Sequence, residues 1–180
     1  MVLRNTTPVD FASILTLHEE SVAVLSPLSY ERLSHLHHEA ALHRVVEEEG
    51  AVMAFLLAFR EGAAYDSPNY VWFARHFERF LYIDRVVVAR SSRARGLGTR
   101  LYRDLFAFAA HASVSTITCE FDVDPPNAAS ERLHAQFGFR EVGRQRVAGG
   151  KKLVSLQAVS ITPDTPASQR EAPCSGRTDV

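Results

Sequence analysis

Lysine and cysteine are scarce in this chain of 180 residues. The only lysines are the adjacent Lys151 and Lys152, so the first 150 residues offer no amine for Schiff-base chemistry. The two cysteines, Cys119 and Cys174, lie far apart and do not suggest a disulfide framework or a zinc site. Cys119 stands in an apolar segment, where a buried thiol behaves as a small hydrophobic group. We therefore do not expect an acyl-cysteine intermediate.

Long hydrophobic runs and an excess of one charge are also lacking. The longest apolar run, residues 51–59, is much shorter than the roughly 20 residues that a membrane-spanning helix needs. The first residues lack the apolar core of a signal peptide. The net charge is −1 and the isoelectric point is about 6.7, which is unlike the basic excess of a general nucleic-acid binder. We expect a cytoplasmic protein that binds neither nucleic acid nor a membrane.

The pattern of apolar residues and turn residues predicts a mixed α/β domain with one sheet. Helices are predicted at residues 8–25, 27–40, 96–112 and 127–139, and strands at 41–49, 50–62, 80–89, 115–123, 140–147 and 151–161. Residues 64–79 form a long aromatic connection in this interpretation. The domain is expected to cover residues 1–162. Residues 163–180 have almost no large apolar side chains, so we expect them to form a disordered tail.

Arginines and glycines gather in residues 90–103, between a predicted strand and a predicted helix. Three interpretations compete: a solvated helix face, a nucleic-acid patch, and a site for a phosphorylated cofactor. The first turn of a helix leaves about four backbone N–H groups without helical partners. Gly96 and Gly98 would let a phosphate approach these groups closely, with Arg93 and Arg95 beside them. The loops G-x-x-x-x-G-K-[ST] and G-x-G-x-x-G are both absent.

The spacing Arg93-x-x-Gly96-x-Gly98 after a strand resembles the acetyl-coenzyme A signature of the GNAT acetyltransferase superfamily. That signature is a strand, then Arg/Gln-x-x-Gly-x-Gly/Ala, then a helix. The order of the predicted elements is also similar to that of the superfamily, over about residues 1–162. The resemblance implies the GNAT acyl-CoA N-acyltransferase fold, an α/β fold with a single mixed, mostly antiparallel twisted sheet flanked by helices. It also implies acetyl-CoA as the cofactor.

A second stretch resembles the superfamily pattern Asn-x-x-Ala-x-x-Leu-Tyr-x-x-x-Gly-Phe. Asn127, Leu133, Gly138 and Phe139 stand at the matching positions, while Ser130 replaces the alanine and His134 replaces the tyrosine. By this resemblance, the cofactor contacts are expected from the following residues: Val86, Val87, Val88, Arg93, Ala94, Arg95, Gly96, Leu97, Gly98, Thr99, Asn127 and Ser130.

His134 is the departure with the clearest chemical meaning. The tyrosine that it replaces often protonates or contacts the leaving thiolate in the superfamily. A thiol has a pKa near 8.5 and a histidine near 6.5, so a histidinium could donate a proton and a neutral imidazole could still stabilise the sulfur weakly. The alternative is that His134 only packs or lies at the surface.

The general base is predicted among acidic and phenolic groups on two strands. Tyr82 and Asp84 lie two residues apart on the strand before the arginine-glycine stretch, and so on one face. Carboxylates on this strand serve as bases in some relatives, so both are candidates. An ion pair between Asp84 and an arginine is the alternative. Asp122, on the strand before Asn127, is a weaker candidate.

The aromatic residues of segment 65–80 are expected to form either a substrate lid or a dimer surface. Tyr70, Trp72 and Phe73 are therefore candidate substrate contacts, together with Tyr30. Histidines cluster at residues 35–43, and His35 and His38 could share a helix face, but the superfamily needs no metal and we expect none. The predicted function is N-acetyl transfer from acetyl-CoA to a primary amine of a small molecule, amino acid or peptide, by direct attack in a ternary complex. The alternative is a non-catalytic acyl-CoA-binding sensor or scaffold. Dimers are common in the superfamily, so a homodimer is one expectation.

Overall fold

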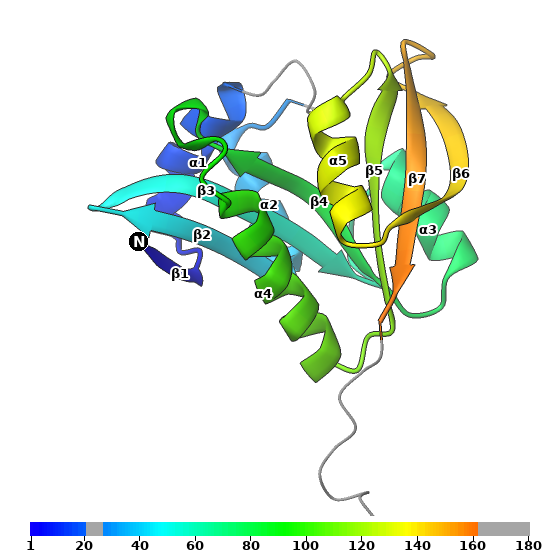
Figure 1. The fold of residues 1–180 in the computed structure, drawn as a ribbon, viewed down its shortest axis with the longest axis horizontal. Helices are drawn as coiled ribbons and strands as arrows, with labels where there is room; N and C mark the ends of the chain where they lie inside the picture. Colours follow the sequence, from blue (N-terminus) through cyan, green and yellow to red (C-terminus); the bar gives the residue numbers. More distant parts are fainter. Residues whose placement is uncertain (21–26, 162–180) are drawn as a thin grey trace, which may run out of the picture.

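The computed structural model describes residues 1–20 and 27–161 of the chain (Figure 1). Its centre is one sheet in the order β1-β2-β3-β4-β5-β7-β6. The strands are β1 (Val2–Asn5), β2 (Leu42–Glu48), β3 (Ala51–Arg60), β4 (Leu81–Val88), β5 (Thr116–Asp124), β6 (Arg140–Val147) and β7 (Lys152–Ser160). Every neighbouring pair is antiparallel except β4 and β5. The predicted fold class, a single mixed and mostly antiparallel sheet flanked by helices, is confirmed.

Helices cover both faces of this sheet. They are α1 (Phe11–Glu19), α2 (Tyr30–Glu39), α3 (Pro68–His76), α4 (Leu97–His111) and α5 (Ala128–Gln136), with short 3-10 turns at Pro8–Asp10 and Arg90–Ser92. In Figure 1, α4 and α5 lie in front of the sheet and α1, α2 and α3 lie behind it. None of the helices among the described residues is long and apolar enough to cross a bilayer.

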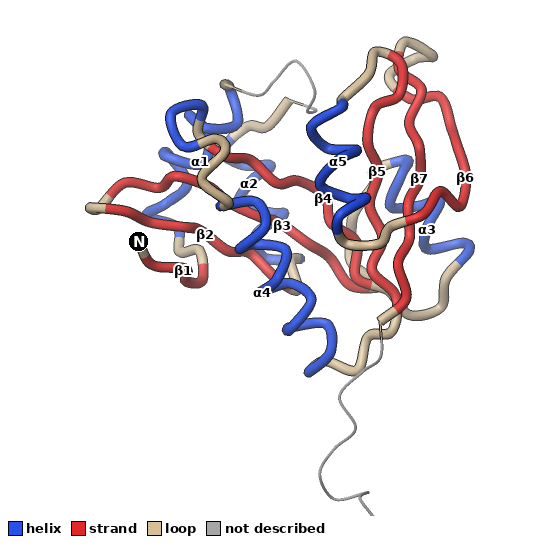
Figure 2. The backbone as a smooth tube through the Cα atoms, viewed as in Figure 1, coloured by secondary structure: helices blue, strands red, loops and turns tan. Residues whose placement is uncertain are grey.

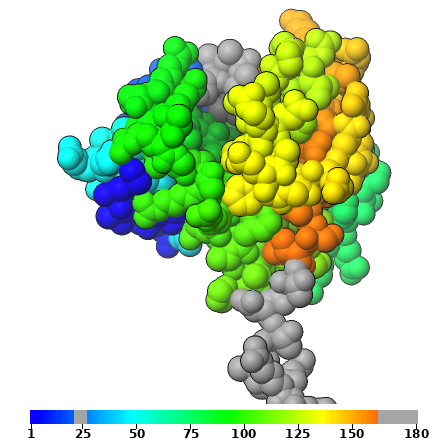
Figure 3. Space-filling view, viewed as in Figure 1, coloured from blue at the N-terminus to red at the C-terminus, as the bar shows by residue number. Residues whose placement is uncertain are grey.

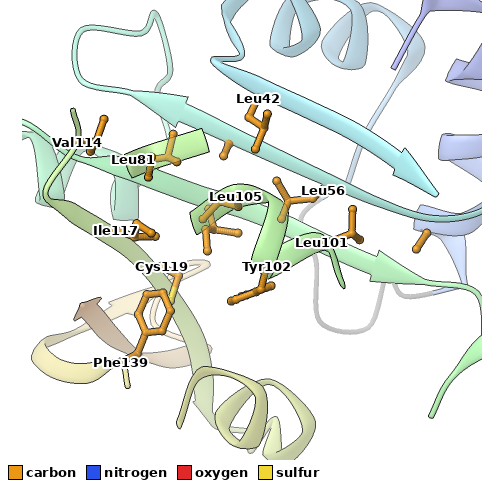
Figure 4. Packing of buried hydrophobic residues seen from close by; sticks show 14 of the residues in the cluster. Leu42, Leu56, Leu81, Leu101, Tyr102, Leu105, Val114, Ile117, Cys119 and Phe139 are labelled. Atoms are coloured by element: carbon orange, nitrogen blue, oxygen red, sulfur yellow. The ribbon is translucent and has the colours of Figure 1, made fainter. Parts of the chain in front are cut away.

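The front face is packed by the apolar stripe of α4. Leu101 and Leu105 are fully buried against Leu56 of β3 and Ile117 of β5 (Figure 4). Tyr102 lies beside them and reaches toward β5 and Phe139 (Figure 4). This spacing of apolar residues is the helical period that predicts α4 from the sequence.

The back face is built from two further clusters of buried side chains. Phe11 and Ile14 of α1 pack with Leu33 of α2 on the strands β2, β3 and β4. Tyr70 and Phe73 of α3 pack on the strand region that carries Phe59 and Tyr82, together with residues of β7. The segment predicted as a long connection thus contains a helix that belongs to the core.

Three sequence expectations are corrected at the level of the elements. The strand β1 was not predicted, and it pairs with β2 at the edge of the sheet. The first helix runs over Phe11–Glu19, after a 3-10 turn at Pro8–Asp10, instead of starting at residue 8. Part of the range predicted for this helix, residues 21–26, lies outside the described residues, as do residues 163–180 with the expected tail. The helix α3 replaces much of the predicted connection because Pro68 starts it and its aromatic residues are buried.

The strands β4 and β5 separate soon after they meet. Their parallel register contains only Leu81 opposite Ile117 and Tyr82 opposite Thr118. Beyond these residues, β4 continues along β3 while β5 continues along β7 (Figure 2). The sheet is therefore split in its middle, between Ile83–Val88 on one side and Cys119–Asp124 on the other.

Candidate active site

A cavity of about 730 Å³ opens at the split in the sheet. This volume lies in the usual range for small-molecule sites. The cavity begins at Ile83 of β4 and Cys119 of β5, directly after the two paired positions. Its other walls come from the loop before α4, the first turn of α4, and α5. In Figure 3, the surface is hollowed between the residues that lead into α4, drawn in green, and those of α5, drawn in yellow.

The first turn of α4 presents free backbone donors to this cavity. The first helical hydrogen bond runs from Arg100 N–H to the Gly96 carbonyl at 3.0 Å, so the N–H groups of Leu97, Gly98 and Thr99 precede the helical ladder. These three residues line the cavity. Gly96 has a φ of 77°, and no atom lies within 4 Å of the position that a Cβ would take there. The open space and the donors fit an anion such as a diphosphate.

The two arginines of the motif have different surroundings. Arg93 lines the cavity beside the free N–H groups. The guanidinium of Arg95 instead donates to both carboxylate oxygens of Glu48, at 2.8 Å and 2.8 Å. Glu48 ends β2, so this ion pair fastens the loop to the β2–β3 hairpin.

A histidine–tyrosine pair forms one inner wall of the cavity. The Tyr102 hydroxyl of α4 lies 2.6 Å from Nε2 of His134 on α5, and both residues are at most 3% exposed. The His134 ring stacks on Phe121 of β5, with ring centroids 5.7 Å apart, and its Nδ1 lies 3.4 Å from the Ser130 hydroxyl. Burial lowers the pKa of His134 to about 4, so the imidazole is neutral at pH 7. Burial also raises the pKa of Tyr102 well above its usual value, so this hydroxyl keeps its proton.

Asp84 lies in a β-bulge on the opposite side of the split. Arg85 pairs with Leu57 and Ile83 pairs with Ala58, which leaves Asp84 without a partner on β3. The Asp84 side chain is only 5% exposed and accepts hydrogen bonds from the Tyr65 hydroxyl and, at 2.5 Å, from Nε of Arg85. Both of its oxygens are therefore engaged within the protein.

Glu120 of β5 is a partly exposed acid of the cavity lining whose oxygen Oε2 is buried. Its Oε1 accepts a hydrogen bond of 3.0 Å from the Tyr82 hydroxyl, and the side chain of Asn69 lies near the carboxylate, but Oε2 has no partner of hydrogen-bond geometry among the described residues. Burial, and then the charge of Asp84, raises the pKa of Glu120 to about 8. Glu120 therefore exchanges its proton near neutral pH, as a general base must.

Comparison with known sequences decides the family. The sequence model of the acetyltransferase (GNAT) family matches residues 11–139, which is well over half of the chain. The chain belongs to the GNAT acetyltransferase family. A curated relative, phosphinothricin N-acetyltransferase of Streptomyces coelicolor, is 44% identical over 66 residues. That match spans 37% of this chain and 37% of the relative.

Solved structures share the GNAT fold over nearly the whole chain. The ribosomal-protein-S18-alanine N-acetyltransferase of Escherichia coli has a TM-score of 0.69 at 16% identity, covering 92% of this chain and 97% of its own. YncA of Salmonella typhimurium, whose structure contains its cofactor acetyl-CoA, has a TM-score of 0.71 at 18% identity, with coverage of 92% and 96%. At these identities the likeness concerns the fold.

The structure brings most of the residues predicted from the GNAT motifs to one cavity. Its lining includes Asp84, Val86, Val87, Val88, Arg93, Ala94, Gly96, Leu97, Gly98, Thr99, Asn127, Ser130 and His134. Asp122 also lines it and accepts a hydrogen bond of 2.8 Å from Lys152. Asn127 caps α5, because its side chain accepts from Ser130 N–H at 3.2 Å.

The remaining candidates lie away from the lining. Tyr82 is fully buried beneath it, with its hydroxyl on Glu120. Tyr70 and Phe73 are buried in the cluster under α3, and Trp72 stacks on His76 with centroids 3.7 Å apart. Tyr30 is 54% exposed and contacts Phe11.

The polar cavity residues that the sequence prediction missed include Arg85, Tyr102 and Glu120. Tyr102 follows Gly98 by four positions, so it lies on the same helix face as the glycine that borders the cavity. Glu120 stands two residues before Asp122, so the two carboxylates share one face of a strand whose first half is uncharged. These two signals are present in the sequence, but nothing in it identifies their partners.

Proposed function

We propose that this chain is an acetyl-CoA-dependent N-acetyltransferase that acts on a primary amine of a small molecule, an amino acid or a peptide. The observation that carries the proposal is the combination of groups in one cavity. Free N–H donors lie at one end of it, a proton donor is supplied by the helices α4 and α5, and a proton acceptor is supplied by the strand β5. These are the groups that acyl transfer to an amine requires.

The cofactor would be held mainly by the first turn of α4. The N–H groups of Leu97, Gly98 and Thr99 would bind its diphosphate, with the charge of Arg93 and the positive end of the helix dipole in support. Bound acetyl-CoA supplies an acetyl group activated as a thioester. The free edge of β4 at Val86–Val88 faces the gap and offers main-chain hydrogen bonds there.

Glu120 is the group that we assign as the proton acceptor. An acceptor amine is an ammonium at neutral pH and must lose a proton before it can attack. Oε2 of Glu120 is unpartnered, and the residue lines the cavity. The charge of Asp84, in contrast, is balanced by Arg85, and its second oxygen accepts a hydrogen bond from the Tyr65 hydroxyl. We therefore assign Asp84 a positioning role in the bulge.

Tyr102 and His134 together are the group that we assign as the proton donor. The neutral His134 cannot act as a histidinium, but the Tyr102 hydroxyl can give its proton to a leaving sulfur. His134 would stabilise the phenolate through the contact at 2.6 Å and carry a proton back to it. In this proposal, the histidine acts through the tyrosine.

A screen with acetyl-CoA and a broad panel of amines tests the proposal. The released thiol is measured with a chromogenic disulfide, and binding of coenzyme A is measured separately by calorimetry. We expect turnover with at least one class of amine, and a loss of about 100-fold in kcat for Glu120→Gln without loss of coenzyme A binding. A matched control is Arg44→Gln, which breaks the ion pair with Asp104 on the outer part of α4.

The alternative function is an acyl-CoA-binding sensor or scaffold. It predicts tight binding of coenzyme A with no thiol release on any amine. A third outcome, in which coenzyme A fails to bind, would contradict both functions. We also propose a homodimer, because dimers are common in the superfamily. Light scattering on the same sample tests this proposal.

A further inference from the structure

Arg85 is a buried cation with an unused donor at the cavity. The residue is 6% exposed and lines the cavity. Its Nε donates to Asp84 and the Tyr65 hydroxyl lies near the guanidinium, but Nη1 has no acceptor of hydrogen-bond geometry among the described residues. A buried charged donor without a partner is strongly destabilising, and sites that keep one usually complete it with a ligand.

Among the described residues, no second carboxylate pairs with the guanidinium of Arg85. Behind it, on the side of α1 and α2, is the buried His43. Burial and the charges of His37 and Arg85, opposed by the carboxylate of Asp10, lower the pKa of His43 to about 3, so this imidazole is neutral at pH 7. Asp84 is the one carboxylate among the described residues that pairs with Arg85.

Glu120, on the neighbouring strand β5, has an acceptor without a hydrogen bond that matches the donor of Arg85. Within the described part of the chain, Oε2 of Glu120 is a buried acceptor without a hydrogen bond and Nη1 of Arg85 is a buried donor without one. Arg85 belongs to β4 and Glu120 to β5, so the two groups lie on the two sides of the split in the sheet. Tyr82 of β4 connects these sides through its hydroxyl bond to Glu120.

We propose that Arg85 binds a carboxylate of the acceptor, and that the acceptor is therefore an amino acid or a related zwitterion whose amine lies against Glu120. A plain amine would meet Glu120 but leave Nη1 of Arg85 unpaired. A zwitterion would bring its carboxylate to Arg85 and its ammonium to Glu120, whose ionised carboxylate accepts the proton that the amine must lose. This inference rests on the proposed acetyltransferase function and narrows its substrate class.

The direct test compares matched acceptors in the thiol-release assay. Each set contains a free amino acid, its carboxamide and its decarboxylated amine, for example methionine, methionine amide and 3-(methylthio)propylamine, and likewise for phenylalanine and glutamate. We expect the free amino acid of at least one set to have a kcat/KM about 10- to 100-fold above both of its partners, as a lost charged hydrogen bond implies. The difference should lie mainly in KM.

Variants of Arg85 then assign the preference to this residue. Arg85→Gln should reduce the ratio of kcat/KM between the amino acid and its carboxamide to within about 3-fold, and Arg85→Lys should restore part of it. Arg44→Gln, which removes another partly buried ion-paired arginine, should leave the ratio unchanged. Thermal melting and coenzyme A binding of each variant identify any that fail to fold. If Arg85→Gln fails to fold, the ratio is compared between the native chain and Arg85→Lys.

The possible outcomes separate the inference from the function on which it rests. Turnover with amides and simple amines at the same kcat/KM as the amino acids overturns the carboxylate contact and leaves the acetyltransferase standing. An unchanged ratio in both Arg85 variants overturns the role of Arg85. No turnover with any amine overturns the function itself.

Discussion

The bond between Tyr102 and His134 allows a sharp test of how α4 and α5 are joined. The two side chains are 1% and 3% exposed and lie 2.6 Å apart. Tyr102→Phe would leave Nε2 of His134 buried without its partner, at a cost of about 1–3 kcal/mol. His134→Phe would keep a ring on Phe121 but leave the tyrosine hydroxyl buried alone, at a similar cost. The double variant loses both polar groups, so its cost should fall short of the sum by about 1–2 kcal/mol.

Urea unfolding at pH 7.5 measures this coupling. Each single variant should lower the midpoint by about 1 M, because m is about 1–3 kcal/mol/M for small domains. A matched control combines His134→Phe with Tyr70→Phe. Tyr70 lies on the other face of the sheet and donates to the Arg60 carbonyl at 2.8 Å. That pair should be additive within about 0.5 kcal/mol.

Additive losses of unfolding free energy for Tyr102→Phe and His134→Phe would refute the reasoning. Two residues that share one buried hydrogen bond should give non-additive losses. The same three proteins also test the proposed proton donor. If Tyr102 acts with His134, the double variant should turn over no more slowly than the slower single variant. A further drop in kcat would separate their roles.

Three further predictions concern backbone, charge and packing. Gly96→Ala places a side chain at a φ of 77° in open space, so it should cost about 1–2 kcal/mol and lower the melting temperature by a few degrees, whereas Gly96→Glu should abolish coenzyme A binding in calorimetry. Glu120 has a pKa of about 8 in the folded chain against 4.5 unfolded, so the folded state holds its proton between these values. The difference in unfolding free energy between the native chain and Glu120→Gln should therefore decrease as pH rises from about 4.5 to 8, because the opposite contributions of the buried His43 and His134 are common to both proteins; a difference independent of pH would contradict the assignment. Gly143→Ala would bring a Cβ to 2.8 Å from Trp72, which should cost about 1–3 kcal/mol and change the emission of this single tryptophan.

Local patterns and the motif resemblance predicted the fold and much of the cavity. The apolar stripe through Leu101 and Leu105 marks α4, and Glu49-Gly50 marks the β2–β3 turn, where both residues have positive φ. These features are set by neighbours in the sequence, so one sequence suffices to find them. The resemblance to the GNAT superfamily added a prediction that periodicity cannot make, namely that the loop at Gly96 and the stretch at Asn127 belong to one cofactor site.

The missed features depend on contacts between distant parts of the chain. The strand β1 has four residues and owes its pairing to β2, so its own pattern is too short to predict it. Ser67 and Pro68 are a helix-start signal, but the aromatic composition after them favoured a loop or a surface. The partners of Glu120 and His134 come from other elements, Tyr82 of β4 and Tyr102 of α4. Alternation along a strand assigns a face, but it does not reveal which charge is buried there.

The split between β4 and β5 places unpaired strand edges in the interior of the molecule. An edge at the rim of a sheet can recruit another protein chain and so lead to aggregation. Here α4 and α5 stand in front of the two inner edges (Figure 1), and the cavity of about 730 Å³ lies between these helices and the strands. The unpaired edges of β4 and β5 thus lie where they do not recruit another chain, and the shape of the cavity selects the ligands that reach them.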